Sequence, residues 1–185
     1  VDLGEQALLW SHTGPRDLYR LDVADASLVE YRMQSAPSSV HVAPGRSHAV
    51  VFTAGSGTGA LAGLPGMEVL DLQDSRGRST PYILESQGVA VAWDDATDGV
   101  RAMILQREAD YIYQLDLLSG AASELPLPGA PTGLWRVPGG DFAVALDGSL
   151  GRVVFADAAG TQTGLAEGFA ILGGLDRPSV QVEVE

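Results

Sequence analysis

The chain contains neither cysteine nor lysine, and each absence restricts what the protein can be. Without cysteine there are no disulfides and no thiolate metal ligands. Without lysine, the basic charge comes from 11 arginines, which stand against 24 acidic residues and leave a net charge of −13. Nucleic acids and anionic membranes require a basic protein surface, so this balance argues against both as partners. The simplest interpretation of the charge is solubility.

Long apolar segments are also missing. No run approaches the ~20 apolar residues of a membrane-spanning helix, and the N-terminal residues do not have the pattern of a secretion signal. No stretch long enough for a helix keeps a 3.6-residue period without an interrupting Gly or Pro. We therefore expect no membrane insertion and almost no helix. A hydrophobic content of 45% over 185 residues is still sufficient for one folded domain with a sizeable core.

A short phrase that ends in aspartate occurs four times. It reads YRLDV, EVLDL, YQLDL and VFADA, and its acid is Asp22, Asp71, Asp116 and Asp157 in turn. These acids are 49, 45 and 41 residues apart. A drifting period of this length is typical of one four-stranded unit per repeat, as in β-propellers. A β-sandwich is the alternative, but sandwiches do not repeat internally.

Each repeat offers up to four short segments of strand character, which we call A to D in chain order. The first repeat lacks segment A, and a further segment A at Phe169–Leu172 and a half-buried strand at Ser179–Glu185 follow the fourth repeat. The predicted strands of the first two repeats are Gln6–Ser11, Leu18–Val23 and Leu28–Met33, then Ser39–Val42, His48–Thr53, Met67–Leu72 and Thr80–Glu85. Those of the next two are Val89–Trp93, Val100–Gln106, Tyr111–Leu117 and Ala122–Leu127, then Gly133–Val137, Phe142–Leu146, Val153–Ala156 and Thr161–Leu165.

Two segments resemble the strand–turn–strand unit of the bacterial TolB-like and YVTN-type propellers. They are VAPGRSHAVVF at Val42–Phe52 and VAWDDATDGVRAMIL at Val91–Leu105, and LDLLSG at Leu115–Gly120 is similar to the end of the families' third strand. The turns depart from the family pattern, because Pro44-Gly45 is not joined by Asp and Asp94–Gly99 contains no Pro. The resemblance implies a scaffold that binds partners and has no catalytic residues.

The sequence thus predicts an all-β protein, a β-propeller of about four four-stranded blades that is either complete or part of a larger propeller. The predicted repeats are residues 1–36, 37–86, 87–130 and 131–167, with a partial repeat at 168–185. The ends of this arrangement need partners. They could pair with further chain, with a second copy, or with each other if Phe169–Leu172 joins the first repeat.

The acidic and glycine-rich motifs have simple structural explanations. An aspartate at the end of a strand accepts hydrogen bonds from the following turn, so the repeated acids are expected to cap turns rather than to bind a cation. Asp94, Asp95 and Asp98 lack the ligand spacing of a calcium loop, which favours a solvated turn. Gly55–Gly59 lacks the lysine and the spacing of a phosphate-binding loop, so we interpret it as a hairpin loop.

The histidines His12, His41 and His48 do not provide a third metal ligand or a nucleophile elbow. We therefore expect no catalytic residue, no metal site and no cofactor. The three tryptophans are expected to fill space between blades, as aromatic side chains commonly do; they are Trp10, Trp93 and Trp135.

In a propeller the D–A and B–C connections lie at one edge of the disc, and loops at such an edge carry binding specificity. The charged residues of these connections are our predicted partner contacts: Arg16, Asp17, Arg107, Glu108, Asp110, Asp147 and Arg152. The predicted function is a non-catalytic binding or scaffolding module of a larger extracytoplasmic bacterial protein. Its partner would be another protein or the remainder of the same propeller. The alternative is a propeller enzyme, a lactonase- or glycosidase-like hydrolase with a site at the hub.

Overall fold

The computed structural model of the chain describes residues 6–10, 16–53, 55, 61–94, 100–138, 140–148 and 151–169. These residues form 15 strands in four antiparallel sheets and contain no α-helix. Sheet 1 contains β1 (Gln6–Trp10), β2 (Asp17–Asp22) and β3 (Leu28–Arg32), and sheet 2 contains β4 (Pro37–Val42), β5 (His48–Thr53), β6 (Gly66–Asp71) and β7 (Ser79–Ile83). Sheet 3 contains β8 (Gly88–Asp94), β9 (Arg101–Gln106), β10 (Tyr111–Asp116) and β11 (Ala122–Pro126), and sheet 4 contains β12 (Pro131–Arg136), β13 (Phe142–Leu146), β14 (Gly151–Ala156) and β15 (Gln162–Phe169).

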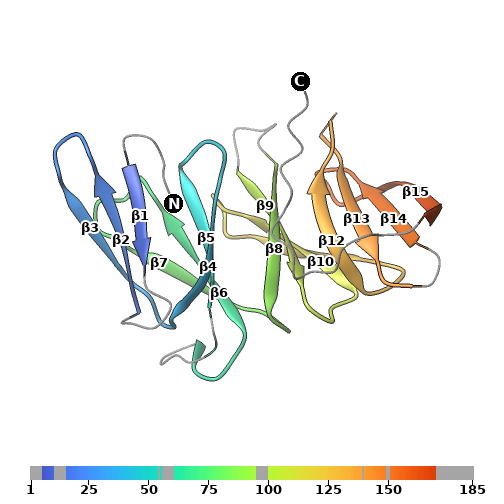
Figure 1. Cartoon of the computed structure of the whole chain (residues 1–185), viewed down its shortest axis with the longest axis horizontal. Coiled ribbons are helices and arrows are strands. Elements are labelled where there is room, and N and C mark those ends of the chain that lie inside the picture. Colours follow the sequence, from blue (N-terminus) through green and yellow to red (C-terminus); the bar gives the residue numbers. More distant parts are fainter. Residues whose placement is uncertain are drawn as a thin grey trace.

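The four sheets follow one another in chain order, with sheet 1 at one end of the molecule and sheet 4 at the other (Figure 1). Within each sheet, strands that are consecutive in sequence are neighbours. The first strands of sheets 3 and 4, β8 and β12, contact each other, whereas the last strand of each sheet lies at its other side. This is the arrangement of propeller blades, and it confirms the predicted all-β propeller of about four blades. Sheet 1 has three strands among the described residues.

The core is divided into three hydrophobic clusters, and each cluster fills the space between two consecutive sheets. Between sheets 1 and 2 the main contributors are Leu8, Leu18, Tyr31, Met33, Ala49, Val51, Leu70 and Leu72. Between sheets 2 and 3 they are Val50, Phe52, Met67, Val69, Leu84, Ala102, Ile104 and Leu115. Between sheets 3 and 4 they are Met103, Leu105, Ile112, Leu125, Phe142, Val144, Leu146, Val154 and Ala156.

The second strand of a blade is buried on both of its faces. Ala49, Val50, Val51 and Phe52 in β5 are each at most 1% exposed. Successive side chains of a strand point to opposite faces, so Ala49 and Val51 pack towards sheet 1 while Val50 and Phe52 pack towards sheet 3. This is why the second strands read as continuous apolar runs instead of alternating patterns.

Glu68 holds the linker between sheets 1 and 2 in place. It lies in β6 and is completely buried. Its Oε1 accepts hydrogen bonds from the backbone N–H groups of Gln34, at 2.7 Å, and Ser35, at 3.4 Å, while its Oε2 accepts one from the Ser79 hydroxyl, at 2.5 Å. Burial raises the pKa of Glu68, because it disfavours the charged carboxylate more than these hydrogen bonds favour it.

The strand boundaries differ from the sequence-based expectation in sheet 4. The sequence ended the outer strand at Leu165 and began a new one at Phe169, but β15 runs without a break from Gln162 to Phe169. Its extension is paired with β14, where Gly151 lies opposite Phe169 and Arg152 forms an ion pair of 2.8 Å with Glu167. Phe169 therefore does not complete sheet 1. Residues 170–185, and with them the predicted final strand, lie outside the described residues.

A second difference concerns Asp94, which the sequence assigned to a solvated turn. Asp94 ends β8 instead, opposite Arg101 of β9, and is only 1% exposed. The strand continues one residue further because pairing with Arg101 extends the ladder. Asp95 and Asp98 lie outside the described residues.

Replacing Glu68 by Gln should remove a pH dependence of stability. A carboxyl with a raised pKa in the folded state stabilises the fold most when the pH is below its ordinary value of 4.5, and this contribution is lost as the pH rises through the raised value. Glu68→Gln keeps an acceptor for Gln34 and Ser35 without a buried charge, so its stability advantage over wild type should grow from acidic to neutral pH, by about 1.4 kcal/mol for each unit of pKa elevation. Urea unfolding at a series of pH values measures this. The exposed Glu124→Gln is the control, and equal pH profiles for both variants would contradict the assignment.

Gly77 should be needed for the packing of sheet 2 on sheet 1. It adopts a φ of +63°, and a Cβ at this position would overlap the carbonyl oxygen of Glu30 in β3. Gly63 has a similar φ of +72° but open space around it. Gly63→Ala should therefore cost only the roughly 1–2 kcal/mol of a left-handed non-glycine residue, whereas Gly77→Ala should cost about 1–3 kcal/mol more because the sheets must move apart. Equal losses of unfolding free energy would show that this contact does not matter.

Candidate functional site

The connections between strands lie at two opposite edges of the sheets. At one edge, the turns after the second strands lie beside the linkers between sheets, because Arg107 N donates to Gln87 O (2.8 Å) and Leu127 N donates to Asp110 O (2.7 Å). Asp147 N donates in the same way to the carbonyl of Ala130, which lies in the linker before β12. We call this the linker edge. In sheets 2, 3 and 4, the turns that join first to second and third to fourth strands form the opposite edge, which we call the turn edge. In sheet 1, the turn between β2 and β3 belongs to the turn edge, and the connection between β1 and β2 belongs to the linker edge.

The linker edge carries all seven predicted partner contacts, but it does not bring them into one pocket. They are distributed over sheets 1, 3 and 4. Four are exposed, namely Arg107, Glu108, Asp110 and Asp147, and three are half-buried, namely Arg16, Asp17 and Arg152. The structure therefore offers an extended charged surface at this edge, and whether it binds a partner stays a prediction.

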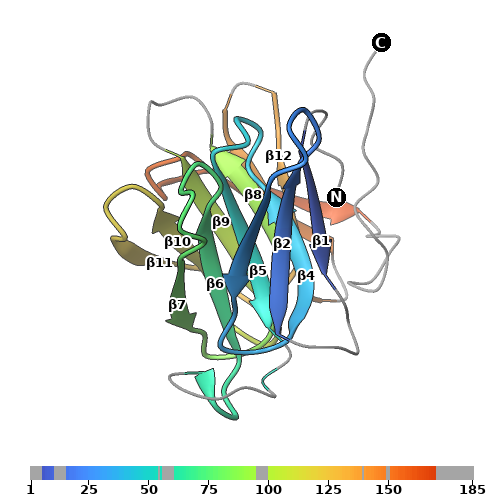
Figure 2. The ribbon, with the colours of Figure 1, turned by 90° about the vertical axis from the view of Figure 1, so that its left-hand side faces the viewer.

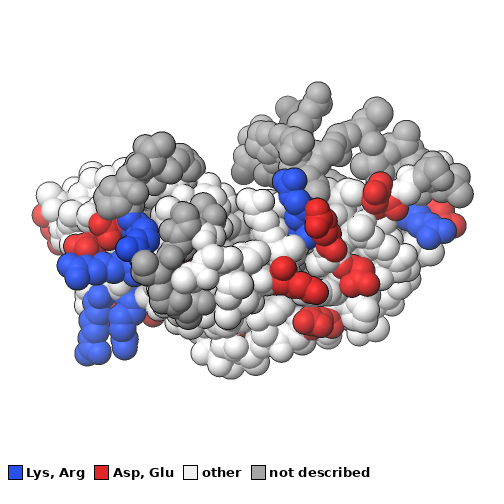
Figure 3. All heavy atoms as spheres, turned by 90° about the horizontal axis from the view of Figure 1, so that it is seen from below, with Lys and Arg blue, Asp and Glu red and all other residues white. Residues whose placement is uncertain are grey.

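Two of the arginines at the linker edge are held by neighbouring groups. Arg16 Nη1 donates to the carbonyl of Gln34 at 3.2 Å, and Arg152 is paired with Glu167. Glu108 adopts a φ of 66°, an unusual value for a residue with a side chain. Seen from this edge, basic side chains gather over the sheet 1 end and acidic side chains spread over the opposite half (Figure 3). The edge is thus polarised along the molecule.

The turn edge carries the repeated aspartates, and they cap turns as the sequence predicted. Asp22 Oδ1 accepts a hydrogen bond from the backbone N–H two residues later, at 3.1 Å, and Asp71 does the same at 2.8 Å. Asp116 Oδ1 accepts from the N–H groups of Leu118 and Ser119, and Asp157 Oδ1 accepts from Thr161 N at 2.7 Å. The backbone and hydroxyl of Ser119 hold the pKa of Asp116 below its ordinary value, so this carboxylate is ionised at neutral pH.

In sheets 2, 3 and 4, the residue that follows the repeated aspartate packs against the preceding sheet. Leu72, Leu117 and Ala158 occupy equivalent positions in sheets 2, 3 and 4 and belong to the three successive hydrophobic clusters. Beside them the turn edge is hollowed. A cleft of about 290 Å³ between sheets 2 and 3 includes His48 and Asp71 in its lining.

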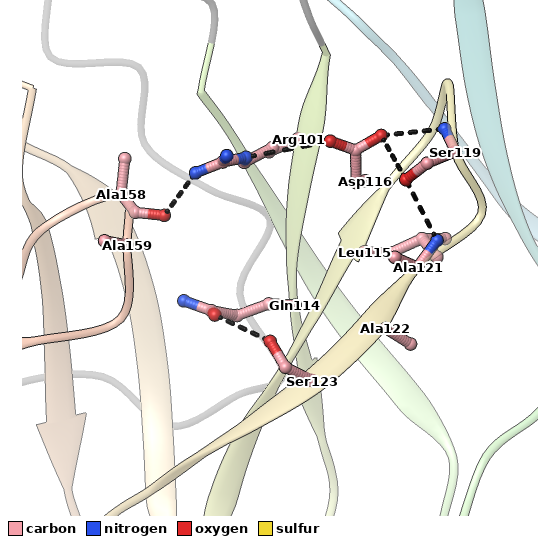
Figure 4. A pocket seen from close by; sticks show the side chains of 10 residues that line it. All are labelled: Arg101, Gln114, Leu115, Asp116, Ser119, Ala121, Ala122, Ser123, Ala158 and Ala159. Carbon is pink, nitrogen blue, oxygen red and sulfur yellow. Dashed lines mark hydrogen bonds and ion pairs between the residues drawn. The ribbon is translucent and has the colours of Figure 1, made fainter.

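A cleft of about 350 Å³ opens between sheets 3 and 4 and is drawn in Figure 4. Arg101 and Asp116 face each other on neighbouring strands, with Nε and Oδ2 3.9 Å apart, and Arg101 Nη1 donates to the carbonyl of Ala158 at 3.2 Å. Gln114 lies beside them, and its Oε1 accepts a hydrogen bond from the Ser123 hydroxyl at 3.0 Å. The sequence analysis missed this cleft. The only signal was the register that places Arg101 and Gln114 on the face shared with Asp116.

The histidines within the described residues have local partners. His41 Nε2 lies 3.1 Å from the Ser39 hydroxyl, and its ring meets Phe52 edge-on with centroids 5.1 Å apart. Burial lowers the pKa of His41, so it is neutral at neutral pH. His48 Nδ1 lies 3.0 Å from the Ser47 hydroxyl. His12 lies outside the described residues. The part of the chain that the structure describes contains no group of three or more His, Cys, Asp or Glu side chains that could hold a metal ion.

The same described residues also contain no helix that is long and apolar enough to cross a membrane.

Comparison with known proteins gives likenesses in structure and not in sequence. No protein-family model matches the chain, and no curated protein matches it. Among solved structures, it resembles the dihydro-heme d1 dehydrogenase NirN with a TM-score of 0.63 and 10% identity, covering 87% of this chain and 34% of that one. The Dos1 propeller is similar with a TM-score of 0.61 and 10% identity, covering 88% and 44%. TolB from Acinetobacter baumannii is similar with a TM-score of 0.50 and 14% identity, covering 86% and 39%.

Identities of 14% or less show a shared fold and nothing finer. The matches extend over nearly all of this chain but over less than half of each of the three proteins. The chain therefore has the fold of a TolB-like β-propeller, and it spans less than half the length of these three proteins.

Proposed function

We propose that the chain is a non-catalytic binding or scaffolding module and forms one part of a larger bacterial propeller outside the cytoplasm. The observation that carries this proposal is the outer face of sheet 1, where the apolar residues Leu9, Val23 and Leu28 are exposed and on which no other sheet of the described residues packs (Figure 2). The location outside the cytoplasm rests on the resemblance to TolB-like propellers. The partner would be the remainder of the ring, another protein, or both.

Equivalent residues show what the outer face of sheet 1 lacks. In sheets 2 and 3, the residue after the repeated aspartate packs on the preceding sheet, so that Leu72 is only 2% exposed and Leu117 is half-buried. In sheet 1 the equivalent Val23 is 61% exposed. On the same face, Leu9 of β1 is 49% exposed and Leu28 of β3 is 57% exposed. Large side chains that are buried at interior positions of the repeat are open to solvent at this end, as expected of a face that another sheet normally covers.

Sheet 4 gives a parallel observation at the other end. Trp93 in the first strand of sheet 3 packs against the cluster between sheets 2 and 3. Trp135, in the first strand of sheet 4, lies opposite Ala143 and is 43% exposed. The prediction that tryptophans fill space between blades is therefore met by Trp93, whereas Trp135 lies on the face of sheet 4 on which no other sheet of the described residues packs.

The linker edge is the proposed surface for a partner protein. Its contacts would be the seven charged residues of the turns and strand ends described above, of which Arg107, Glu108 and Asp110 form one exposed group on a single turn. Charged side chains at the end of a rigid sheet can be presented without a cost in core packing. The polarity seen in Figure 3 would orient a partner along this edge.

A propeller hydrolase with a site at the hub is the alternative. It would need ionisable side chains that converge from the first strands of the sheets. Strands β4, β8 and β12 contribute only His41, Asp94 and Arg136 to such a set. The likeness to a dehydrogenase is at 10% identity and concerns the fold. The binding module is therefore the better supported proposal.

Charges on the outer face of sheet 1 should reduce its affinity for apolar molecules. Leu9→Glu combined with Leu28→Glu should lower the fluorescence enhancement of the dye 8-anilinonaphthalene-1-sulfonate severalfold, because this dye binds to exposed apolar surface. The unfolding free energy should change by no more than about 0.5 kcal/mol for each substitution, since both side chains are half exposed. The control is Ala24→Glu with Ser27→Glu, which adds the same charge at exposed positions of the adjoining turn. Equal dye binding by the two double variants would contradict the proposal.

A photo-crosslinking residue placed at Glu108 should capture a protein partner. The same residue placed at Ser75, which is exposed at the turn edge, should not, because the two positions lie at opposite edges of the sheets. Both variants would be exposed to an extract of the source cells, and the adducts would be identified by mass spectrometry. Adducts of the same composition and yield from both positions would show that the linker edge is not the partner surface.

A further inference from the structure

We propose that the cleft between sheets 3 and 4 at the turn edge is a second binding site, and that it takes the amide group of a peptide. We call it the Gln114 cleft; its polar members are Arg101, Gln114, Asp116, Ser119 and Ser123 (Figure 4). It lies at the edge opposite the surface proposed for the protein partner, so it stands independently of that surface.

The first argument is a buried polar atom with no partner. Gln114 Nε2 is inaccessible to solvent and forms no hydrogen bond, although Oε1 accepts one from Ser123. Buried side-chain amides nearly always have partners for both atoms. Turning the amide over would not solve this, because Oε1 would then take the unpaired place. One atom of this amide therefore requires a group that the described residues do not supply.

The second argument is that the fold does not need an amide here. Val69 holds the equivalent position in sheet 2, two residues before Asp71, just as Gln114 stands two residues before Asp116. Val69 is 7% exposed and packs in the cluster between sheets 2 and 3. An apolar side chain thus satisfies packing at this place in the repeat, and an unpaired amide in its place lowers stability unless it has a ligand.

The acceptor side of the cleft is Asp116. Its Oδ1 accepts hydrogen bonds from Leu118 N, Ser119 N and the Ser119 hydroxyl. Its Oδ2 has the 3.9 Å ion pair with Arg101, which is too long for a hydrogen bond. Oδ2 can therefore accept an N–H from a ligand. Because Arg101 and Asp116 cancel in charge, the cleft favours a neutral ligand that both donates and accepts.

The shape of the cleft selects a small planar group. Its volume of about 350 Å³ is at the lower end of ligand sites. Its remaining lining is small or apolar and consists of Leu115, Ser119, Ala121, Ala122, Ala158 and Ala159. Among the described residues no aromatic side chain lines it, so they provide no flat apolar surface against which a sugar ring could stack. A peptide unit fits these walls better, with its N–H on Asp116 and its C=O on Gln114.

The turn of sheet 4 controls access to the amide. Gly160 covers Gln114 Nε2, since a Cβ at this glycine would lie 2.7 Å from that nitrogen. The ligand carbonyl therefore meets the amide when the Gln114 side chain turns toward the cleft, which breaks only the hydrogen bond from Ser123. The side-chain NH₂ resonance of Gln114 should report this movement directly.

The test is an NMR titration of the isotope-labelled 185-residue chain with the capped dipeptide N-acetyl-glycyl-glycinamide. We expect a saturable shift of the Gln114 side-chain NH₂ and of the Gly160 backbone amide. Ala158→Leu introduces the residue found at the equivalent positions Leu72 and Leu117, so it should narrow the cleft beside Gln114 within a fold that already tolerates it. This variant should weaken binding by about tenfold or more. The matched control Ala24→Leu, at an exposed turn of sheet 1, should bind like wild type.

Two further titrations test which chemical group the cleft binds. Acetate and methyl glucoside are titrated in the same way, and shifts at Gln114 that saturate with either one but not with the dipeptide would overturn the peptide assignment. Absence of any saturable shift with the dipeptide would overturn the site itself. If Ala158→Leu does not fold, the variant Gln114→Val is used instead, and its binding is measured from the chemical shift of the Gly160 backbone amide. An unchanged affinity of this variant for the dipeptide would equally refute the proposal.

Discussion

The structure depends on one constraint, which is that the sheets in its interior are apolar on both faces. A sheet of this kind cannot be stable alone, because its inner strands would expose two rows of apolar side chains to water. The second strands show this most clearly, since Val50 and Val51 are both fully buried although they point in opposite directions. Each sheet therefore requires a neighbour on either side, and the repeat propagates until a ring closes or an end is covered.

Because of the same constraint, apolar side chains are exposed at the two ends of the molecule, whereas they are buried in its interior. Three interfaces between sheets are filled by three separate clusters, and each cluster takes residues from only two sheets. Val23 is 61% exposed where its equivalents Leu72 and Leu117 are packed, and Trp135 is 43% exposed on the outer face of sheet 4. In the interior, such apolar side chains are covered by a neighbouring sheet. The exposed side chains at the ends thus indicate faces that further sheets would cover, and this supports a role as part of a larger assembly.

Because packing uses the faces of the sheets, the edges are the parts that can vary. The linker edge presents exposed charges on turns such as Arg107–Asp110. The turn edge holds its aspartates in turn caps and opens clefts between them, where side chains such as Gln114 and Val69 replace each other without disturbing the fold. Proteins as different as NirN, TolB and Dos1 share this fold with the chain. The fold alone therefore does not indicate the function, which has to be inferred from the residues at the edges.

Much of the architecture could be predicted from the sequence, because it follows from local patterns. The runs His48–Thr53 and Phe142–Leu146 are strands in the structure with the same limits as the sequence suggested. The repeated aspartates cap turns because a carboxylate reaches the backbone two to four residues further along the chain, which is a local interaction. Such interactions need no knowledge of what lies on the neighbouring strand or sheet.

Tertiary structure decided the features that depend on pairing or on neighbouring sheets. Asp94 is buried because β8 pairs as far as Arg101, and β15 continues to Phe169 because it pairs with β14. The burial of Glu68 follows from the path of the linker between sheets 1 and 2. The Gln114 cleft lies where Ala158, which is 44 residues from Gln114 in sequence, meets sheet 3. By itself the sequence determined the strands and their repeat through local periodicity, whereas contacts between distant residues determined which polar groups became buried and where the clefts opened.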